Sequence, residues 1–191
     1  MKPDNQIARK ITTLCEDRNI SIDELAERSG LKKEQIEVLL NSSNIPSLSP
    51  LIKIARAIGV RLGTFLDDSS GIGPVIHRKS TPQEPITFSS QLSSANSHLD
   101  FVSLASNKSG RAMEPFIIEV NTPVNQKPVL SSHEGEEFIY VLEGNIKINY
   151  GSEEYILSAG DSIYYDSIVD HLVTSAEGQI AKILAVVYTP L

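Results

Sequence analysis

The chain has 191 residues, 40% of them hydrophobic, and a formal net charge of −7. This composition excludes an intrinsically disordered protein, and the length is sufficient for two small domains. No apolar run of about 18 residues and no apolar leader occurs, so we expect a cytoplasmic protein that does not enter a membrane. The single cysteine, Cys15, excludes an internal disulfide, and its place on the apolar side of the first expected helix indicates a buried structural thiol.

Charge divides the chain into two unequal parts. Residues 1–66 hold 10 basic and 8 acidic side chains, a net charge of +2, whereas residues 67–191 hold 7 and 16, a net charge of −9. A mildly basic head on an acidic body is expected if only the head meets the phosphates of a nucleic acid.

Residues 1–67 are predicted to form an all-α domain of short helices. Apolar side chains recur at helical spacing, and Ser21 stands three residues before Glu24, which is the capping-box signature of a helix start. Gly30 ends that helix in a tight turn. The expected helices span about residues 5–18, 22–28 and 32–40, followed by one that carries residues 51–58 and a last one over 61–65.

A short helix, a glycine-containing turn and further packed helices make a helix-turn-helix bundle. The stretches Leu25–Leu31, Pro46–Leu48 and Leu51–Val60 resemble the Xre/Cro-repressor type over about residues 6–66. The resemblance implies that the helix after Gly30 binds double-stranded operator DNA. The alternative is a helical bundle that serves protein contacts, with its charges solvated.

The resemblance also implies which side chains meet DNA. Carried over residue by residue, the recognition positions and their flanking phosphate contact are Lys32, Lys33, Glu34, Gln35, Glu37 and Val38. Gln35 would read an adenine edge, and Lys33 a guanine or a phosphate. Glu34 and Glu37 would accept hydrogen bonds from cytosine but also repel phosphates. Glu37 and Val38 stand where the family usually has a small polar residue and often an arginine.

A second domain follows an acidic stretch punctuated by glycine and proline. Residues 68–74 are predicted to be a linker, and residues 75–191 an all-β domain of short strands separated by turn signals. The expected strands are 75–78, 99–104, 116–120, 138–142, 146–150, 154–157, 163–165, 171–174 and 180–188. A double-sheet jelly roll fits this pattern, so the fold class is α + β, with two domains.

Two histidines and one glutamate in this domain have the spacing of a metal site. His133 and Glu137 lie four residues apart at the mouth of an extended segment, where that spacing places both side chains on one face. His171, near a later strand, is the expected third ligand. Two imidazoles and one carboxylate with open positions suit Fe(II), and zinc, nickel or manganese also fit such ligands.

The all-β domain resembles a single cupin domain. The first cupin motif can be laid on Ser131, His133, Glu137 and Gly144, and the second on Gly160, Asp166, His171 and Ser175. Ser131 occupies the place of the first metal-binding histidine, so three of the usual four ligands remain. Three interpretations stay open. The three residues bind a divalent metal, they line an effector pocket without metal, or they are structural.

Three further residues are expected to bind a small-molecule effector. Ile139 and Val141 share the face of Glu137 and should point into the barrel. Arg111 precedes a strand and is placed to meet an anionic effector. The neighbouring carboxylates, such as that of Glu134, are expected to be solvated.

A DNA-reading head joined to a ligand-binding barrel has the layout of a one-component transcriptional regulator. Such regulators resemble this chain over nearly its whole length. An effector or metal would shift the population that is competent for DNA. Cupin barrels pair through strand edges, so we expect a homodimer that places two heads on half-sites about 34 Å apart.

The alternative function is enzymatic. A mononuclear non-haem iron epoxidase that acts on hydroxypropylphosphonic acid has the same plan of helical head and cupin barrel, and the same His, Glu, His ligand set. That enzyme class needs tyrosines near the metal to hold a phosphonate. Residues 100–104, which align with its tyrosine-rich strand, supply none. We therefore expect a regulator rather than an enzyme.

Overall fold

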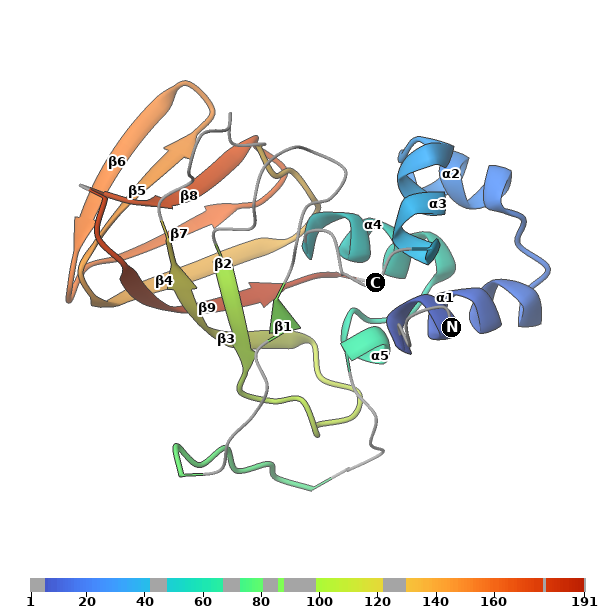
Figure 1. Cartoon of the computed structure of the whole chain (residues 1–191), viewed down its shortest axis with the longest axis horizontal. Helices are drawn as coiled ribbons and strands as arrows, with labels where there is room; N and C mark the ends of the chain where they lie inside the picture. Colours follow the sequence, from blue (N-terminus) through green and yellow to red (C-terminus); the bar gives the residue numbers. More distant parts are fainter. Residues whose placement is uncertain are drawn as a thin grey trace.

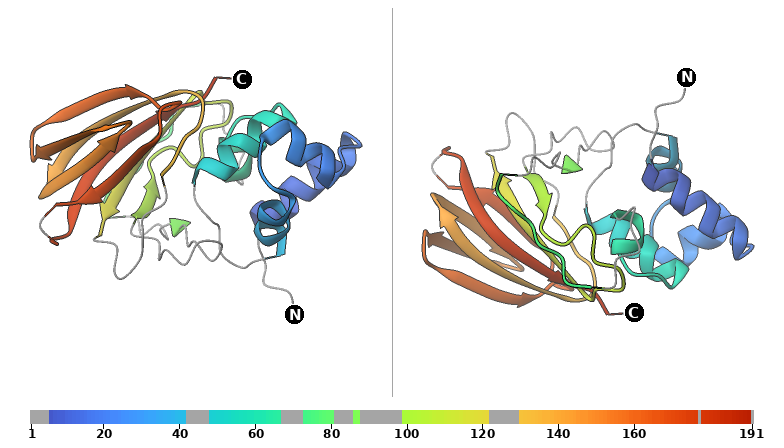
Figure 2. Two further views of the ribbon diagram at one scale, coloured as in Figure 1. Left: turned by 90° about the horizontal axis from the view of Figure 1, so that it is seen from above. Right: turned by 90° about the horizontal axis from the view of Figure 1, so that it is seen from below.

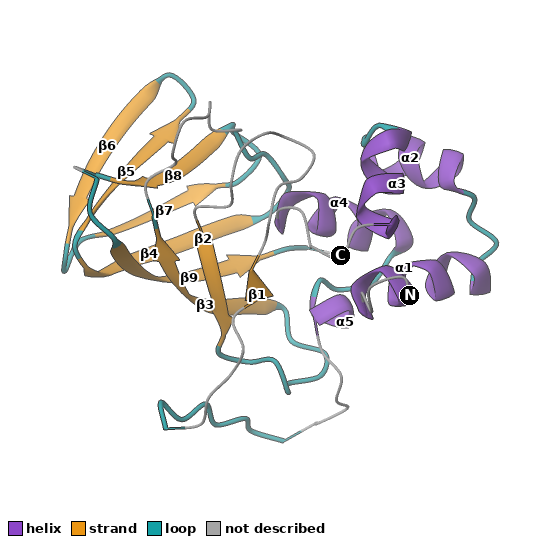
Figure 3. Ribbon diagram, viewed as in Figure 1, coloured by secondary structure: helices purple, strands orange, loops and turns teal. Residues whose placement is uncertain are grey.

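A computed structural model describes residues 6–41, 48–66, 73–80, 86–87, 99–121, 130–176 and 178–190. Helices fill the N-terminal part and strands the C-terminal part, so the molecule has the expected α + β architecture of two domains (Figures 1 and 3). The predicted linker lies outside the described residues except for Gly73 and Pro74, and Pro46 and Ser47 lie outside them as well. No helix in the described ranges is long and apolar enough to cross a bilayer.

The helical head follows the predicted order. Its helices are α1 (Gln6–Asp17), α2 (Ile22–Ser29), α3 (Lys33–Asn41), α4 (Leu48–Ile58) and α5 (Gly63–Leu66). The Ser21 hydroxyl accepts a hydrogen bond from the Glu24 amide at 3.2 Å, and Gly30 closes α2 with a φ of 66°. Because only glycine adopts that φ without strain, the predicted cap and turn are both confirmed.

The strands form two antiparallel sheets. They are β1 (Ile86–Thr87), β2 (Leu99–Ser103), β3 (Met113–Val120), β4 (Glu136–Glu143), β5 (Asn145–Tyr150), β6 (Glu153–Ser158), β7 (Ser162–Asp166), β8 (His171–Ser175) and β9 (Ala181–Tyr188). One sheet has the order β1-β2-β3-β9-β4-β7, and the other has the order β6-β5-β8. The two sheets face each other in Figures 1 and 2. The strand expected over residues 75–78 is wrong, since no strand among the described residues pairs with it.

Alternating burial along the strands builds the barrel core. In β3 and β9 every second side chain is buried, as the period of an extended chain requires. The fully buried side chains of the barrel include Phe116, Ile139, Ile146 and Ile148. The same alternation carries Glu137, which precedes Ile139 by two residues, to the inner face of β4.

Among the described residues, two contacts between the head and the barrel stand out. Helix α4 lies between the barrel and the other large helices of the head (Figures 1 and 2). At the first place, which we name the α4 contact, Ser49 and Arg56 of α4 meet Ser132 and Glu134 of the barrel. At the second, the α5 contact, Gly63 lies against Arg111 and Glu114 near the start of β3. A Cβ atom on Gly63 would lie 2.9 Å from Glu114 Oε1, so this contact is tightly packed.

Candidate metal centre and DNA-binding helix

The three predicted metal ligands come together at the barrel mouth. His133 lies in the segment before β4, Glu137 is the second residue of β4, and His171 opens β8. One potential ligand atom from each residue lies within 4.8 Å of the others. Glu137 and His171 come from different sheets and His133 comes from the segment before β4, so the site exists only because the barrel closes.

Both imidazoles converge on one carboxylate oxygen. His133 Nε2 lies 2.8 Å from Glu137 Oε1, and His171 Nε2 lies 3.4 Å from the same oxygen. The two histidine rings meet edge to face, with centroids 5.5 Å apart. His133 and His171 are 3% and 4% exposed, so the donor atoms are shielded from bulk water.

The outer ring nitrogens of both histidines are hydrogen-bonded to backbone carbonyls. His133 Nδ1 donates to the Glu134 carbonyl at 3.1 Å, and His171 Nδ1 donates to the Val169 carbonyl at 2.8 Å. A carbonyl can only accept, so each Nδ1 carries a proton and each Nε2 is oriented as a ligand. Two imidazole nitrogens and one carboxylate oxygen are a donor set that a divalent cation would fit.

Two hydroxyl groups hold the carboxylate of Glu137 in place. Tyr165 Oη donates to Glu137 Oε2 at 2.8 Å, and Ser167 Oγ donates to Oε1 at 3.2 Å. Sequence reasoning missed both residues. The signal was available for Tyr165, because alternation along β7 turns it inward and the register places it opposite Glu137.

Burial and contacts with charged neighbours shift the pKa values of Glu137 and His171 in opposite directions. Burial raises the pKa of Glu137, but the hydrogen bonds and charges of His133 and His171 outweigh it and hold that pKa well below its usual range. Burial lowers the pKa of His171, but its bond to Glu137 raises it overall. Burial and the charge of Glu137 raise the pKa of Tyr165 well above its ordinary value, so its hydroxyl remains a donor.

The fourth cupin ligand position is occupied by Ser131. Ser131 and His171 exchange two backbone hydrogen bonds of 2.8 and 2.9 Å as an antiparallel pair. Residues directly opposite each other in such a pair turn their side chains to the same face. Ser131 therefore lies on the same face as His171 and offers no imidazole there.

The residues expected to bind an effector lie in two different places. Ile139 and Val141 are 1% and 0% exposed and share the inner face of β4 with Glu137, as expected. Arg111 is instead part of the α5 contact, where its Nε lies 2.7 Å from Glu114 Oε2 and its Nη1 lies 2.8 Å from the Lys108 carbonyl. Its charge is already neutralised by Glu114, so Arg111 is not placed to meet an anionic ligand.

The predicted DNA-reading residues lie on and just before α3. Lys32, Lys33, Glu34 and Glu37 are exposed, while Gln35 and Val38 are half-buried. Lys33 Nζ pairs with Asp23 Oδ1 at 2.6 Å, and the Gln35 side chain accepts a hydrogen bond from the Lys32 amide at 2.9 Å. The Gln35 carboxamide therefore caps α3 in the absence of DNA.

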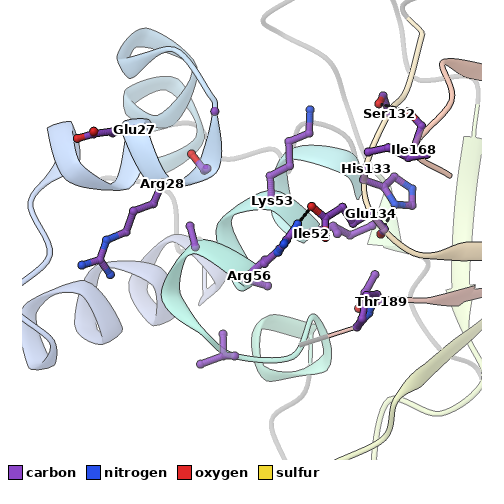
Figure 4. A pocket seen from close by; sticks show the side chains of 16 residues that line it. Glu27, Arg28, Ile52, Lys53, Arg56, Ser132, His133, Glu134, Ile168 and Thr189 are labelled. Atoms are coloured by element: carbon purple, nitrogen blue, oxygen red, sulfur yellow. Dashed lines mark hydrogen bonds and ion pairs between the residues drawn. The ribbon is translucent and has the colours of Figure 1, made fainter.

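A cavity of about 560 Å³ separates part of the head from the barrel mouth. The C-terminal end of α2, one side of α4, the segment Ser132–Glu134 and Ile168 line it, together with Thr189 and Pro190. Figure 4 shows His133 and Glu134 on the barrel side and Lys53 and Arg56 on the side of α4, with a dashed line joining Arg56 to Glu134. Glu134, which was expected to be solvated, is thus engaged by the head.

Comparison with known proteins agrees with this division of the chain. The Cro/C1-type HTH DNA-binding domain family matches residues 10–70, and the cupin domain family matches residues 118–187. The chain is 24% identical to the HTH-type transcriptional regulator PuuR of Escherichia coli over 184 residues, which cover 95% of this chain and 94% of that protein.

Two further similarities cover most of the chain. The crystal structure of an HTH_3 family transcriptional regulator from Vibrio cholerae superposes with a TM-score of 0.68 at 20% identity, covering 98% of this chain and 97% of that one. The (S)-2-hydroxypropylphosphonic acid epoxidase of Streptomyces wedmorensis is 29% identical over 157 residues, 73% of each chain. The chain therefore carries a Cro/C1-type HTH DNA-binding domain followed by a cupin domain, and over nearly its whole length it is similar to HTH-type transcriptional regulators.

Proposed function

We propose that the cupin barrel of this regulator binds a divalent metal through His133, Glu137 and His171 and that occupancy of the barrel controls binding of the head to an operator. The observation that carries the proposal is the convergence of two imidazole nitrogens on one buried carboxylate at the barrel mouth, beside α4. Iron, zinc, nickel and manganese all suit two nitrogen donors and one oxygen donor. A small-molecule effector would enter on the open coordination side, beside Ile139 and Val141.

Metal analysis tests the site directly. Purified wild-type protein is loaded with Fe(II), Zn²⁺, Ni²⁺ or Mn²⁺, dialysed, and analysed for bound metal beside the variant His171→Ala. We expect close to one ion per chain in the wild type and loss of that ion in the variant. His77→Ala is the matched control, because His77 lies outside the cluster, and it should keep the metal. Equal metal in wild type and His171→Ala would refute the site.

The DNA contacts form the second half of the proposal. Lys32, Lys33, Glu34, Gln35, Glu37 and Val38 would face the major groove or its phosphates. The test uses a duplex selected by the wild-type protein from a random pool. Lys32→Ala should weaken binding across sequences and reduce the salt slope by about 1, whereas Gln35→Ala should cost about 1–3 kcal/mol and relax specificity at one base pair. If neither variant changes binding, α3 is not the reading helix.

A homodimer is the oligomeric state that we propose. The register of the six-stranded sheet aligns Pro115, Val186, Phe138 and Tyr164 across four neighbouring strands, on the face opposite to the barrel core. An apolar row of this kind on an outer face is typical of an interface, and a two-fold pair would present two heads to a palindromic operator. Sedimentation equilibrium should give twice the chain mass, and Val186→Asp should give a monomer that still binds metal.

An iron-dependent oxygenase is the second candidate, favoured by the similarity to the Streptomyces epoxidase and by the His, Glu, His cluster. Incubation with Fe(II), oxygen and (S)-2-hydroxypropylphosphonic acid, followed by phosphorus NMR, distinguishes the two functions. We expect no epoxide. Turnover that depends on His171 would replace the regulator proposal with the enzyme.

A further inference from the structure

The barrel segment that carries the first metal ligand is held by both domains. We name Ser132–Glu134 the ligand loop. From the barrel side, the His133 amide donates a hydrogen bond to the Ser167 carbonyl at 3.0 Å, and the Ser132 hydroxyl donates one to the Ile168 carbonyl at 2.9 Å. From the head, the Ser49 hydroxyl donates to the Ser132 carbonyl at 3.1 Å, and Arg56 forms an ion pair with Glu134.

The ring of His133 is hydrogen-bonded to Glu134, the residue that forms an ion pair with Arg56. Its Nδ1 donates to the carbonyl of Glu134 at 3.1 Å, while its Nε2 faces Glu137 at 2.8 Å. An ion held by His133 and Glu137 would replace the direct contact between these two side chains. The His133 ring would then shift, and the Glu134 peptide that its other nitrogen holds would shift with it.

On the head side, the contact is made by the helix that supports the reading unit. Helix α4 packs against α2, and both contribute to the buried core of the head through side chains such as Leu25 and Leu51. The two contacting residues, Ser49 and Arg56, lie near opposite ends of α4, so they determine how this helix sits on the ligand loop. A displacement of α4 therefore carries α2 and α3 with it.

The cavity beside the ligand loop leaves room for such a displacement. Close-packed interfaces resist small shifts, because every atom has neighbours on all sides. Here about 560 Å³ between α2, α4 and the ligand loop is not filled by side chains. The α4 contact therefore consists of a few polar links beside open space rather than a packed surface (Figure 4).

We infer that the ligand loop transmits occupancy of the metal site to the head, and that Arg56, Ser49 and Glu134 are the positioning residues of this coupling. The inference rests on the proposed function, because it requires that the His133, Glu137, His171 site binds an ion. It adds that the signal leaves the barrel through α4, and that the α5 contact acts as the fixed point about which the head reorients.

The test measures coupling rather than binding alone. The dissociation constant for the selected duplex is determined without metal and with saturating Mn²⁺ or Zn²⁺, and the ratio of the two constants is the coupling factor. A coupling of the usual size changes affinity about 5–150-fold. We expect a factor in this range for the wild type and a factor near 1 for Arg56→Gln and for Glu134→Gln, with the ion still bound in both variants.

Three comparisons separate coupling from a general loss of structure. The charge exchange Arg56→Glu with Glu134→Arg should restore the coupling factor, which a purely structural defect would not do. Glu143→Gln is the matched control, because it removes an exposed pair between Glu143 Oε2 and Lys182 Nζ, 3.9 Å apart on the barrel surface, and it should leave the factor unchanged. Ser49→Ala should reduce the factor partially.

The outcomes distinguish this inference from the function on which it rests. A wild type that binds no ion overturns both. A wild type that binds metal but shows a factor near 1 overturns the inference and leaves the metal site standing. A wild-type factor that persists in Arg56→Gln, Glu134→Gln and Ser49→Ala also overturns it, because the signal then leaves the barrel by another route.

Discussion

The ion pairs at the two contacts between head and barrel differ in how far water reaches them. At the α5 contact, the side chains of Arg111 and Glu114 are 6% and 3% exposed, and at the α4 contact those of Arg56 and Glu134 are 52% and 44% exposed. A buried ion pair cannot separate without leaving a charge in an apolar environment, whereas an exposed pair exchanges its partner for water at little cost. The buried pair lies within the barrel and Gly63 of the head packs against it, whereas the exposed pair itself links the head to the barrel, so the second contact is the one whose link can open.

The largest expected effect comes from breaking the buried pair. Glu114→Gln leaves the Arg111 guanidinium buried without its counter-charge, so we expect the free energy of unfolding to fall by about 3–5 kcal/mol. Urea denaturation measures this change. The double variant Arg111→Met with Glu114→Leu should recover most of the loss, because no buried charge remains. A loss below about 1 kcal/mol in Glu114→Gln would show that water reaches the α5 contact and would erase the difference between the two contacts.

The second effect tests whether the proposed metal site beside the α4 contact depends on the hydroxyl group that orients Glu137. Tyr165→Phe removes the hydroxyl that orients Glu137, and loss of such a partner typically lowers metal affinity about 10–100-fold. A competition titration with a fluorescent chelator measures this affinity. Tyr164→Phe is the control, since Tyr164 is exposed and its hydroxyl bonds Glu136 instead. Equal affinities in the two variants would contradict the assignment of Glu137 as a ligand.

A third, smaller effect probes the packing of the α5 contact. Gly63→Ala places a Cβ atom 2.9 Å from Glu114 Oε1 and 3.1 Å from Arg111 Cζ, so we expect destabilisation by about 1–3 kcal/mol from overpacking. Thermal unfolding of the full chain measures it. Gly73→Ala, which would meet no atom within 4 Å, should leave stability nearly unchanged. If both variants unfold alike, the α5 contact is looser than its geometry indicates.

The smallest expected effect is on stability at the other contact. Arg56→Gln removes an exposed pair, so the free energy of unfolding should change by less than about 1 kcal/mol, and less still at high salt. Paired denaturation curves at low and high ionic strength measure this change. A loss comparable with that of Glu114→Gln would mean that the α4 contact is a permanent joint, which would remove the basis for adjustable coupling.

Local pattern was sufficient to predict the elements and their order. Helical spacing, the Ser21 cap and Gly30 placed α2 within one residue at its C-terminal end, because these signals act over a few residues. The prediction of a strand over residues 75–78 was wrong because strand formation does not depend on local signals alone. An apolar extended stretch becomes a strand only if another strand pairs with it, and neighbouring strands are a property of the fold rather than of the segment.

The candidate site was partly predictable for the same reason. His133 and Glu137 share a face by spacing, and His171 was expected as the partner from a later strand. Tyr165 and Ser167 were missed because their contact with Glu137 depends on the register between β7 and β4. Arg111 was assigned to an effector because its neighbour Glu114 was not recognised as a buried partner. The pair between Arg56 and Glu134 joins residues from different domains, and no short-range signal reports it.

The replacement of a histidine by Ser131 has a consequence for how the proposed centre would behave over time. Three protein donors hold a cation less firmly than four, so a bound ion would keep coordination positions for water or a small ligand. Such a centre exchanges its ion with the surroundings instead of retaining it from synthesis onward. It would then report the current supply of its ion or ligand, which is the property that a reversible sensor requires and a structural cofactor avoids.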